Sequence, residues 1–316
     1  MSNDKLYKIV DTTGWKRGIS TDPLYPIVID NQGQQYVLKG MRASRINEMI
    51  VSKACEIANF DAVKNEFACN ESKQRPATIS RLLDYDIEPL IMHLKQPLLA
   101  KGRVLTTPIS EIFNHKHLHI DANFKKRYVD EVLLRSTFDD TDSYFHNISV
   151  KKSKQEAGTF STGTTQPPLE LSTSYDFDYC LGRKRDTEMF ALLCKDLQHI
   201  EHNIEFIRKH YPQNAEKFFA DFTFDSATLD KVFDLSGAPQ EWYIKLRIHN
   251  GWDSEQDIAN SIATINELSK NTRTIFQQNL NFMKNTYSKK KTFQTGGITP
   301  TSPHTQAPQE SLSQNT

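Results

Sequence analysis

Four short polar segments stand in a fixed order within the first 180 residues, and each adjoins an apolar stretch that can hold it rigidly. In chain order they are Val37-Leu38-Lys39, Asn47-Glu48, the loop from Asp142 to Asn147, and Tyr175-Asp176-Phe177-Asp178. A lysine on a strand, a glutamate on the next helix, an Asp-x4-Asn loop and a later Asp-Phe-Asp are the parts that phosphoryl transfer needs. The order therefore favours a fold that gathers these four segments around one cleft, and it predicts an ATP-dependent kinase.

The size and charge of the chain limit its class. Its 316 residues suffice for one large domain or for two lobes around a cleft. Lysine plus arginine and aspartate plus glutamate are equal at 39 each, so the net charge is zero. This balance argues against general nucleic-acid binding, which needs a strong basic excess. No apolar run reaches 18 residues, so we expect no membrane span.

The four cysteines and the N-terminal segment favour a reducing compartment. No two cysteines form a Cys-x-x-Cys pair, so a structural zinc site is not expected. Three of the four lie in apolar surroundings, which suits buried, reduced thiols. The first 15 residues lack the uninterrupted apolar core of a signal peptide. We therefore expect a cytoplasmic protein, with secretion as an effector by another route left open.

The first 60 residues favour strands followed by a helix. Apolar segments at 6–10, 25–29 and 35–39 are typical of strands, and the turn-rich tetrapeptide 30–33 predicts that the last two form a hairpin. Residues 44–59 carry apolar side chains at helical spacing, namely Ile46, Met49, Ile50, Ala54 and Ile57. Ser44 is the candidate N-cap of that helix.

The middle of the chain predicts mixed structure and the remainder predicts helices. The middle has a short helix within 88–94, a strand at 103–105, a helix at 124–136, and strands at 146–151 and 168–172 that flank a polar loop. Helical patterns then follow at 186–207, 213–221, 227–234, 239–247 and 258–275. Residues 292–316 hold almost no apolar side chains and are expected to be disordered.

This layout predicts an α+β fold with two lobes. We expect a strand-rich, nucleotide-binding N-terminal lobe over residues 1–94 and a helical, catalytic C-terminal lobe over residues 95–288. A polar tail over residues 289–316 completes the expected organisation.

Lys39 and Glu48 are candidate partners at the nucleotide site. Strand alternation turns Lys39 to the same face of the sheet as Val37, where a lysine is costly unless it meets an anion such as a phosphate or a carboxylate. Glu48 lies early in the predicted helix and close to its apolar face. Taken singly, Lys39 also fits a solvated strand end, and Glu48 also fits a carboxylate that interacts favourably with the helix dipole.

Asp142, Asn147 and Asp176 are candidates for the chemical step and for the metal. In phosphoryl transfer a carboxylate accepts the proton of the attacking hydroxyl, and an amide oxygen a few residues later holds Mg²⁺. The predicted hairpin returns Asp176 to the end of the strand that Asn147 begins, so both oxygens are expected at one open end. The alternative for each segment alone is an acidic surface turn.

A glycine-containing segment between the first two predicted strands is a weaker candidate for phosphate contact. Glycine lets backbone amides approach phosphate, and the Ser20 and Thr21 hydroxyls can add donors after Gly18. The spacing fits neither a Walker A loop nor the standard kinase glycine loop.

Together these segments resemble those of the HipA-like kinases, which are bacterial serine/threonine kinases with a reduced two-lobed fold. The resemblance rests on Gly18-Ile-Ser-Thr21, Tyr36-Val-Leu-Lys39, Asn47-Glu48, Asp142-x4-Asn147 and Tyr175-Asp176, within residues 10–250. It implies ATP and Mg²⁺ as cofactors, Lys39 on the ATP phosphates, Asp142 as the catalytic aspartate, and Asn147 and Asp176 as magnesium ligands. It also implies self-phosphorylation near Ser20 or Thr21, a protein substrate, and an antitoxin or other regulatory partner.

The sequence departs from the family pattern at one place. The family loop usually carries Arg-His after the aspartate, whereas this chain has Ser143-Tyr144. This loss favours a second hypothesis, a catalytically impaired relative that serves as an interaction module. A lipid or small-molecule kinase is a third, because the chemistry would use the same residues.

One further motif is His115-Lys-His117-Leu-His119. Alternating histidines suggest a metal site, but no acidic or cysteine partner lies nearby in sequence. We therefore expect a solvated loop.

Overall fold

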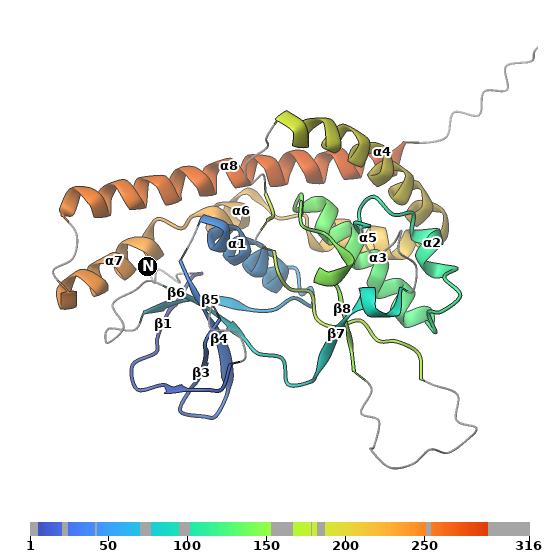
Figure 1. The fold of residues 1–316 in the computed structure, drawn as a ribbon. Coiled ribbons are helices and arrows are strands. Elements are labelled where there is room, and N and C mark those ends of the chain that lie inside the picture. The colour runs from blue at the N-terminus through green and yellow to red at the C-terminus, as the bar shows by residue number, and fades with distance from the viewer. Residues whose placement is uncertain are drawn as a thin grey trace, which may run out of the picture.

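In the computed structural model, six strands among the described residues form one mixed sheet in the N-terminal lobe (Figure 1). The structure describes residues 6–20, 25–41, 43–69, 77–94, 102–152, 167–177, 179–181, 187–250 and 254–289. The strands are β1 (Ile9–Asp11), β2 (Lys16–Arg17), β3 (Ile27–Ile29), β4 (Gln35–Gly40), β5 (Asn65–Cys69) and β6 (Ala77–Arg81). Their order is β1-β5-β6-β4-β3-β2, with β1 parallel to β5 and the other pairs antiparallel.

The predicted hairpin is confirmed as β3 and β4. Asp30 organises its turn, since one carboxylate oxygen accepts from the amides of Gln32 at 2.8 Å and Gln34 at 2.9 Å. Gly33 has a φ of +85°, a backbone conformation that side chains disfavour. The turn thus sets the register that pairs Ile27 with Val37.

Helix α1 (Ala43–Ile57) packs on this sheet as its apolar periodicity predicts. Ile46, Met49, Ile50 and Ala54 are all buried in the main core. Two details differ from expectation. The helix already begins at Ala43, so Ser44 is not its N-cap, and Ile57 is 38% exposed because it lies in the final turn, beyond the sheet contact.

The segment between α1 and residue 94 holds two strands that the sequence did not reveal. Strands β5 and β6 occupy the middle of the sheet, and polar residues such as Asn65, Thr78 and Ser80 are buried in them. The helix expected within 88–94 is a strand β7 (Ile87–Pro89) followed by a 3₁₀ turn η2 (Leu90–His93). The strand expected at 103–105 is reduced to one bridge between Arg103 and Tyr144.

The middle of the chain is built around helix α3 (Ala122–Thr137), the helix predicted at 124–136. Asp121 caps it by accepting from the Phe124 amide at 2.8 Å. A short helix α2 (Ile109–Phe113) precedes α3, and a 3₁₀ turn η4 (Phe145–Asn147) leads into β8 (Ser149–Lys151), which pairs with β7.

The second strand of the long hairpin expected after β8 is present only as a partial pairing. Leu171 bridges Val150, and the Ser172 amide donates to the Ser149 carbonyl at 2.8 Å. This pairing is enough to return the chain beside β8. The expected loop at the tip of the hairpin lies almost wholly outside the described residues.

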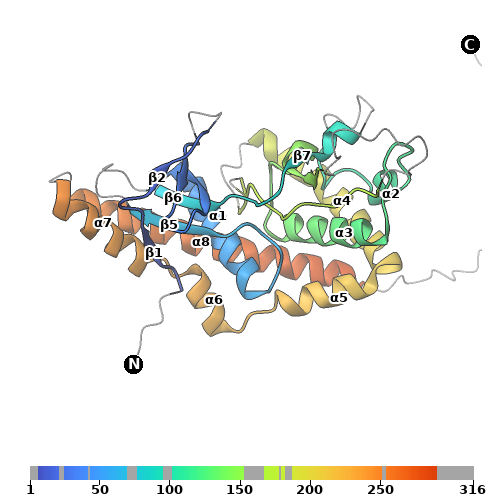
Figure 2. The same cartoon turned by 90° about the horizontal axis from the view of Figure 1, so that it is seen from below.

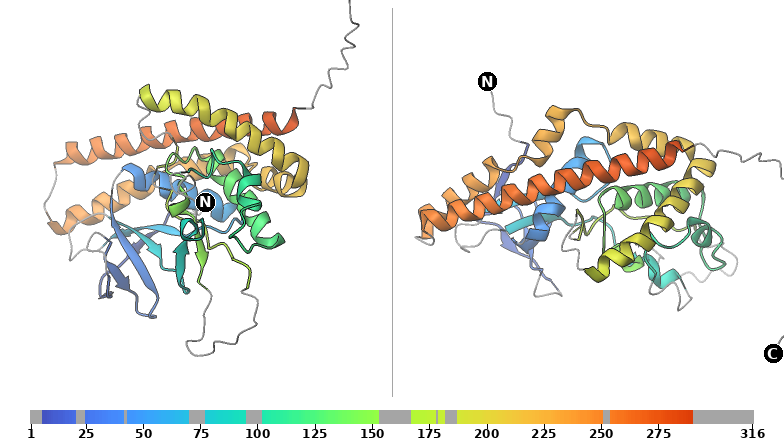
Figure 3. Two further views of the ribbon diagram at one scale, coloured as in Figure 1. Left: turned by 45° about the vertical axis from the view of Figure 1, so that its right-hand side comes forward. Right: turned by 90° about the horizontal axis from the view of Figure 1, so that it is seen from above.

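The C-terminal half is helical, as predicted. Its helices are α4 (Thr187–His210), α5 (Pro212–Asp221), α6 (Ser226–Phe233), α7 (Gly237–Asn250) and α8 (Glu255–Ser288). Helix α8 runs along most of the length of the molecule, as the views in Figure 2 and Figure 3 agree, and it contacts α1 as well as α3 and α4. The polar tail lies outside the described residues after Lys289.

Trp242 of α7 ties the helical half to strand β5, because its indole nitrogen donates to the Ala68 carbonyl at 3.0 Å. Within the described ranges, no helix is long and apolar enough to cross a membrane.

Candidate active site

The predicted contact between Lys39 and Glu48 is present. Lys39 lies on β4 opposite Thr78 of β6, and its ammonium is 2.6 Å from the Glu48 carboxylate on α1. The Lys39 side chain is 15% exposed and that of Glu48 is 4% exposed. The pair therefore joins the sheet to α1 in surroundings that screen charge weakly, and Glu48 fixes the direction of the lysine.

A second cation shares Glu48, and its part in the site was not predicted from the sequence. Arg45 lies one helical turn earlier and donates from a terminal nitrogen to the other carboxylate oxygen at 3.0 Å. Its guanidinium also lies 5.9 Å from the centre of the Tyr25 ring. One carboxylate thus meets two cations, and this small cluster carries a net positive charge.

The loop that carries Asp142 is held by its own backbone. The Asp140 carboxylate accepts from the Asp142 amide at 3.0 Å, and the Asn147 side-chain amide donates to the Asp142 carbonyl at 2.7 Å. This hydrogen bond uses the side-chain nitrogen of Asn147, and the side-chain oxygen, which is the acceptor of the same amide group, takes no part in it. On the outer side of the loop, the Val104 amide donates to the Ser143 carbonyl at 2.7 Å.

Arg135 holds the loop that carries Asp142 from its core side, and this residue was not predicted from the sequence. Its side chain, near the end of α3, is fully buried and ion-paired with Glu131 at 2.7 Å and with Asp140. One terminal nitrogen donates to the backbone carbonyls of Asn147 and Tyr175, each at 3.1 Å. A single guanidinium therefore brings together the chain segments that carry two predicted metal ligands.

A signal for Arg135 does exist in the sequence. The residue interrupts the apolar run Val132-Leu133-Leu134 and lies four positions after Glu131. Such a charge within a buried stretch requires partners, which here come from loops distant in sequence.

Asp176 directly follows Tyr175, whose backbone carbonyl accepts from Arg135, and it has an unusual backbone conformation. Its φ is +60°, in the left-handed region that residues other than glycine seldom adopt. Burial raises the pKa of the Asp176 carboxyl, with the charge of Lys39 opposing the shift and those of Glu48 and Asp142 adding to it. In the part of the chain that the structure describes, no hydrogen bond or ion pair engages this carboxylate.

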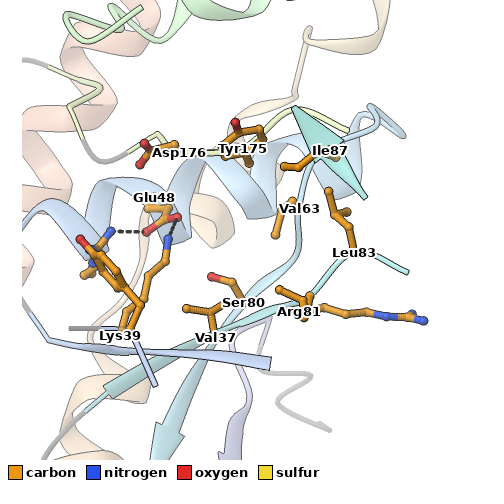
Figure 4. Close-up of a pocket in the computed structure, with 13 residues that line it drawn as sticks. Val37, Lys39, Glu48, Val63, Ser80, Arg81, Leu83, Ile87, Tyr175 and Asp176 are labelled. Carbon is orange, nitrogen blue, oxygen red and sulfur yellow. Dashed lines mark hydrogen bonds and ion pairs between the residues drawn. The ribbon is translucent and has the colours of Figure 1, made fainter. Parts of the chain in front are cut away.

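The cationic cluster around Glu48 and the Asp176 carboxylate line a cavity of about 290 Å³ between the two lobes, which Figure 4 shows in close-up. In this view Glu48 lies between Lys39 and Asp176 at one end of the cavity, and Tyr175 lies beside Asp176. The lining residues are Tyr25, Val37, Lys39, Arg45, Glu48, Val63, Ser80, Arg81, Leu82, Leu83, Ile87, Tyr175 and Asp176. Val63, Leu83 and Ile87 lie toward one end, where the Arg81 side chain points away, and Lys39 and Glu48 lie toward the other.

Not all predicted site residues reach this cavity. Lys39, Glu48 and Asp176 line it, whereas Asp142 and Asn147, which are hydrogen-bonded to each other, are not among its lining residues. The charge of Asp142 nevertheless helps to raise the pKa of the Asp176 carboxyl. Thr21 and Asp178 lie outside the described residues.

The glycine segment has a packing role in the structure. A side chain on Gly18 would place its first carbon 2.8 Å from a methyl group of Ile27, and the Gly18 amide donates to the Ile27 carbonyl at 2.9 Å. The amide is thus engaged in the β2–β3 pairing. The Ser20 hydroxyl donates to the backbone carbonyl of Tyr25 at 2.9 Å, and Tyr25 lines the cavity.

The histidine motif is only partly solvated. His117 and His119 are exposed, but His115 is buried, contrary to expectation, because its loop folds back after α2. Burial and the neighbouring His117 lower the pKa of His115. Among the described residues, no three His, Cys, Asp or Glu side chains converge as a metal cluster.

The arrangement fits a magnesium nucleotide better than a tightly held metal. The Asp176 carboxylate and the Asn147 side-chain oxygen are hard oxygen donors, which Mg²⁺ prefers, and Mg²⁺ usually takes few protein ligands beside phosphates and water. The cationic cluster of Lys39 and Arg45 suits phosphates, and the apolar end of the cavity suits a base.

Comparison with known proteins gives no relative by sequence, because no family model and no curated protein matches this chain. The structure is similar to that of the Helicobacter pylori proinflammatory kinase CtkA, with a TM-score of 0.52 and 7% identity over 89% of this chain and 97% of that chain. It matches Shewanella oneidensis HipA, solved with HipB and operator DNA, at a TM-score of 0.43 and 10% identity, over 86% of this chain and 67% of that chain. It matches the Golgi casein kinase with Mn/ADP bound at a TM-score of 0.41 and 8% identity, over 90% of this chain and 75% of that chain. The likeness to CtkA shows that this chain has the expected α+β, two-lobed, kinase-like fold.

Proposed function

We propose that this protein is a Mg-ATP-dependent kinase that transfers a phosphoryl group to a serine or threonine hydroxyl of a protein. The observation that carries the proposal is that the Lys39–Glu48 pair and Asp176 line one cavity. Each group comes from a different part of the chain, and a purely structural role would not require them to face a shared space. The kinase-like fold supports the same conclusion.

Each residue then has a definite task. Mg-ATP, when bound, supplies the phosphoryl group and a metal that neutralises the phosphate charge. Lys39 donates to phosphate oxygens while Glu48 and Arg45 keep the charged wall in place. Asp176 and Asn147 hold the metal, and Asp142 accepts the proton of the attacking hydroxyl.

The Ser143-Tyr144 substitution is compatible with this assignment because the loop has other supports. The Val104 amide fixes Ser143, and the Arg103 guanidinium donates to the Tyr144 hydroxyl at 3.2 Å while stacking on its ring. These contacts fix the loop on the side where the family motif carries Arg-His. The polar segments quoted above make a HipA-like serine/threonine kinase the finer form of the proposal, with a regulatory partner of the antitoxin kind.

The test is transfer of radiolabel from ATP in the presence of Mg²⁺, with cell extract as the source of acceptor. We expect labelling by the wild-type protein and its loss on metal chelation. Asp142→Asn and Asp176→Ala should each lower the rate by about 10²-fold or more, since a positioned acid or base contributes about 10²–10⁴-fold. Both variants should keep the wild-type melting temperature within a few degrees.

Asp139→Asn is the matched control. It removes a carboxylate from the same loop, and asparagine tolerates the φ of +50° found there. This variant should keep most of the activity. Retention of activity by Asp142→Asn would overturn the catalytic assignment, and nucleotide binding without transfer in the wild type would favour the impaired interaction module. Labelled lipid or metabolite in place of protein would favour the small-molecule kinase.

A further inference from the structure

Asn47, the residue before Glu48 on α1, reaches across to the segment that follows Asp176. Its side chain is 7% exposed, and its amide nitrogen donates to the backbone carbonyl of Cys180 at 2.7 Å. The two residues are 133 positions apart in sequence. Because neighbouring helical residues point about 100° apart, Asn47 and Glu48 serve two different contacts from one turn of helix.

The segment 179–181 is also tied to the loop that carries Asp142. The Thr141 amide and hydroxyl both donate to the Tyr179 carbonyl, at 3.2 Å and 2.9 Å. The Leu181 amide donates to the Phe138 carbonyl at 2.7 Å. This segment therefore lies between α1 on one side and the Asp142 loop on the other, with hydrogen bonds to both.

The backbone on this segment is held in a conformation that needs support. Leu181 has a φ of +57° and Asp176 a φ of +60°. Such left-handed conformations cost on the order of 1 kcal/mol or more for residues with side chains, and they persist where surrounding contacts fix them. Cys180 lies between these two residues in sequence, and its hydrogen bond from Asn47 attaches this stretch of backbone to α1.

We infer that Asn47 is a positioning residue, which sets the placement of the Lys39–Glu48 pair relative to Asp176 and Asp142. A helix shift that moved Glu48 would stretch the Asn47–Cys180 hydrogen bond, so the two halves of the site move together. Asparagine suits this task because its short amide donates in one direction and is buried without charge. The catalytic part of this inference rests on the proposed kinase function.

The test compares Asn47→Ala and Asn47→Asp with Ser52→Ala. Ser52 is a matched control because it is a buried polar residue on the same helix, donating to the Val63 carbonyl at 3.0 Å and accepting from the Asn65 amide at 2.9 Å. Its contacts stay within the N-terminal lobe. Substitution at either position removes buried hydrogen bonding, but only substitution of Asn47 removes the link to segment 179–181.

We expect the Asn47 variants to lower kcat by about tenfold or more, since small misplacements of reacting groups have effects up to about 10²-fold. Their affinity for ADP without metal should stay within about twofold, because the cavity wall is unchanged. Ser52→Ala should keep kcat within about twofold. A second variant, Thr141→Val, should be non-additive with Asn47→Ala, because both remove supports of the same segment.

Hydrogen–deuterium exchange separates this inference from the proposed function. The peptide ending at Leu181 should exchange faster in Asn47→Ala than in the wild type, and Ser52→Ala should leave it unchanged. Unchanged exchange in Asn47→Ala, or equal loss of kcat in Ser52→Ala, would overturn the inference. An inactive wild type would remove the proposed kinase function and the catalytic role of Asn47, while the exchange result would still decide whether the link exists.

Discussion

Arg135 and Asp140 form an ion pair in which neither side chain has solvent-exposed surface. Asp140 in turn accepts from the Asp142 amide. Arg135 donates to the backbone carbonyls of Asn147 and of Tyr175, the residue before Asp176. Charge is costly to bury, so such a pair contributes little net stability but is strongly destabilising to break. The pair therefore makes the geometry of the catalytic loop dependent on the integrity of the core.

Replacing Arg135 by methionine should lower the free energy of unfolding by about 3–5 kcal/mol, because Glu131 and Asp140 would remain buried without their cation. Urea unfolding measures this. Arg127→Met is the control on the same helix, since its partner Asp61 is 57% exposed and the pair should contribute about 1 kcal/mol or less. Equal losses in the two variants would contradict the structural role given to Arg135.

Lys39→Ala should weaken Mg-ATP binding by an amount equivalent to a few kcal/mol, since it removes the counter-charge of a desolvated phosphate and leaves Glu48 facing the cavity. Glu48→Ala should have a smaller effect of the same sign. Calorimetric titration measures both. Lys53→Ala breaks a 2.6 Å pair with Glu56 on α1 away from the cavity and should bind as the wild type does. Absence of Mg-ATP binding by the wild type would contradict the nucleotide site itself.

A pH dependence of stability should arise at Asp130 of α3. Burial raises the pKa of this carboxyl, against the lowering effect of a 2.9 Å hydrogen bond from Asn214 of α5. Because the folded state holds its proton more tightly than the unfolded state, Asp130 lowers the free energy of unfolding as the pH rises from about 3.9 through the raised value. Asp130→Asn should therefore gain stability relative to the wild type between pH 4 and pH 7. Urea unfolding at several pH values tests this, and a constant difference would show that Asp130 does not titrate in that window.

Self-phosphorylation is expected at Ser20. The hydroxyl lies next to Tyr25, which lines the cavity, and a phosphate there would add nearly two negative charges close to the site of the ATP phosphates. Mass spectrometry of the active protein should find this phosphate, or one on Thr21, and should find neither in Asp142→Asn. Equal phosphate in both proteins would show that another kinase added it.

The sequence predicted the elements whose periodicity follows directly from burial. Helix α1 has one apolar face, and β4 alternates, so Lys39 and Glu48 were correctly placed on neighbouring elements. Strands β5 and β6 were missed because polar residues are buried in them. Asn65 and Ser80 satisfy one another across the two strands, and nothing in the local pattern indicates such a distant partner.

The candidate site was predictable in its carboxylates but not in its supports. Asp142 and Asp176 stand in recognisable spacings, whereas Arg135 and Asn47 act through backbone carbonyls that any residue provides. Because every residue has a backbone carbonyl, such a contact does not constrain which residue type provides the acceptor. For the same reason the sharing of Glu48 between Lys39 and Arg45 becomes visible only once the helix is placed against the sheet.

Helix α8 has a mechanical consequence for turnover. It contacts α1 of one lobe and α3 and α4 of the other, so it links the two lobes directly. A hinge rotation that opened the lobes would have to shear these contacts along the helix. We therefore expect substrate entry and product exit to depend on small movements of the segments at the front of the cavity, with the lobes themselves kept at a nearly fixed separation.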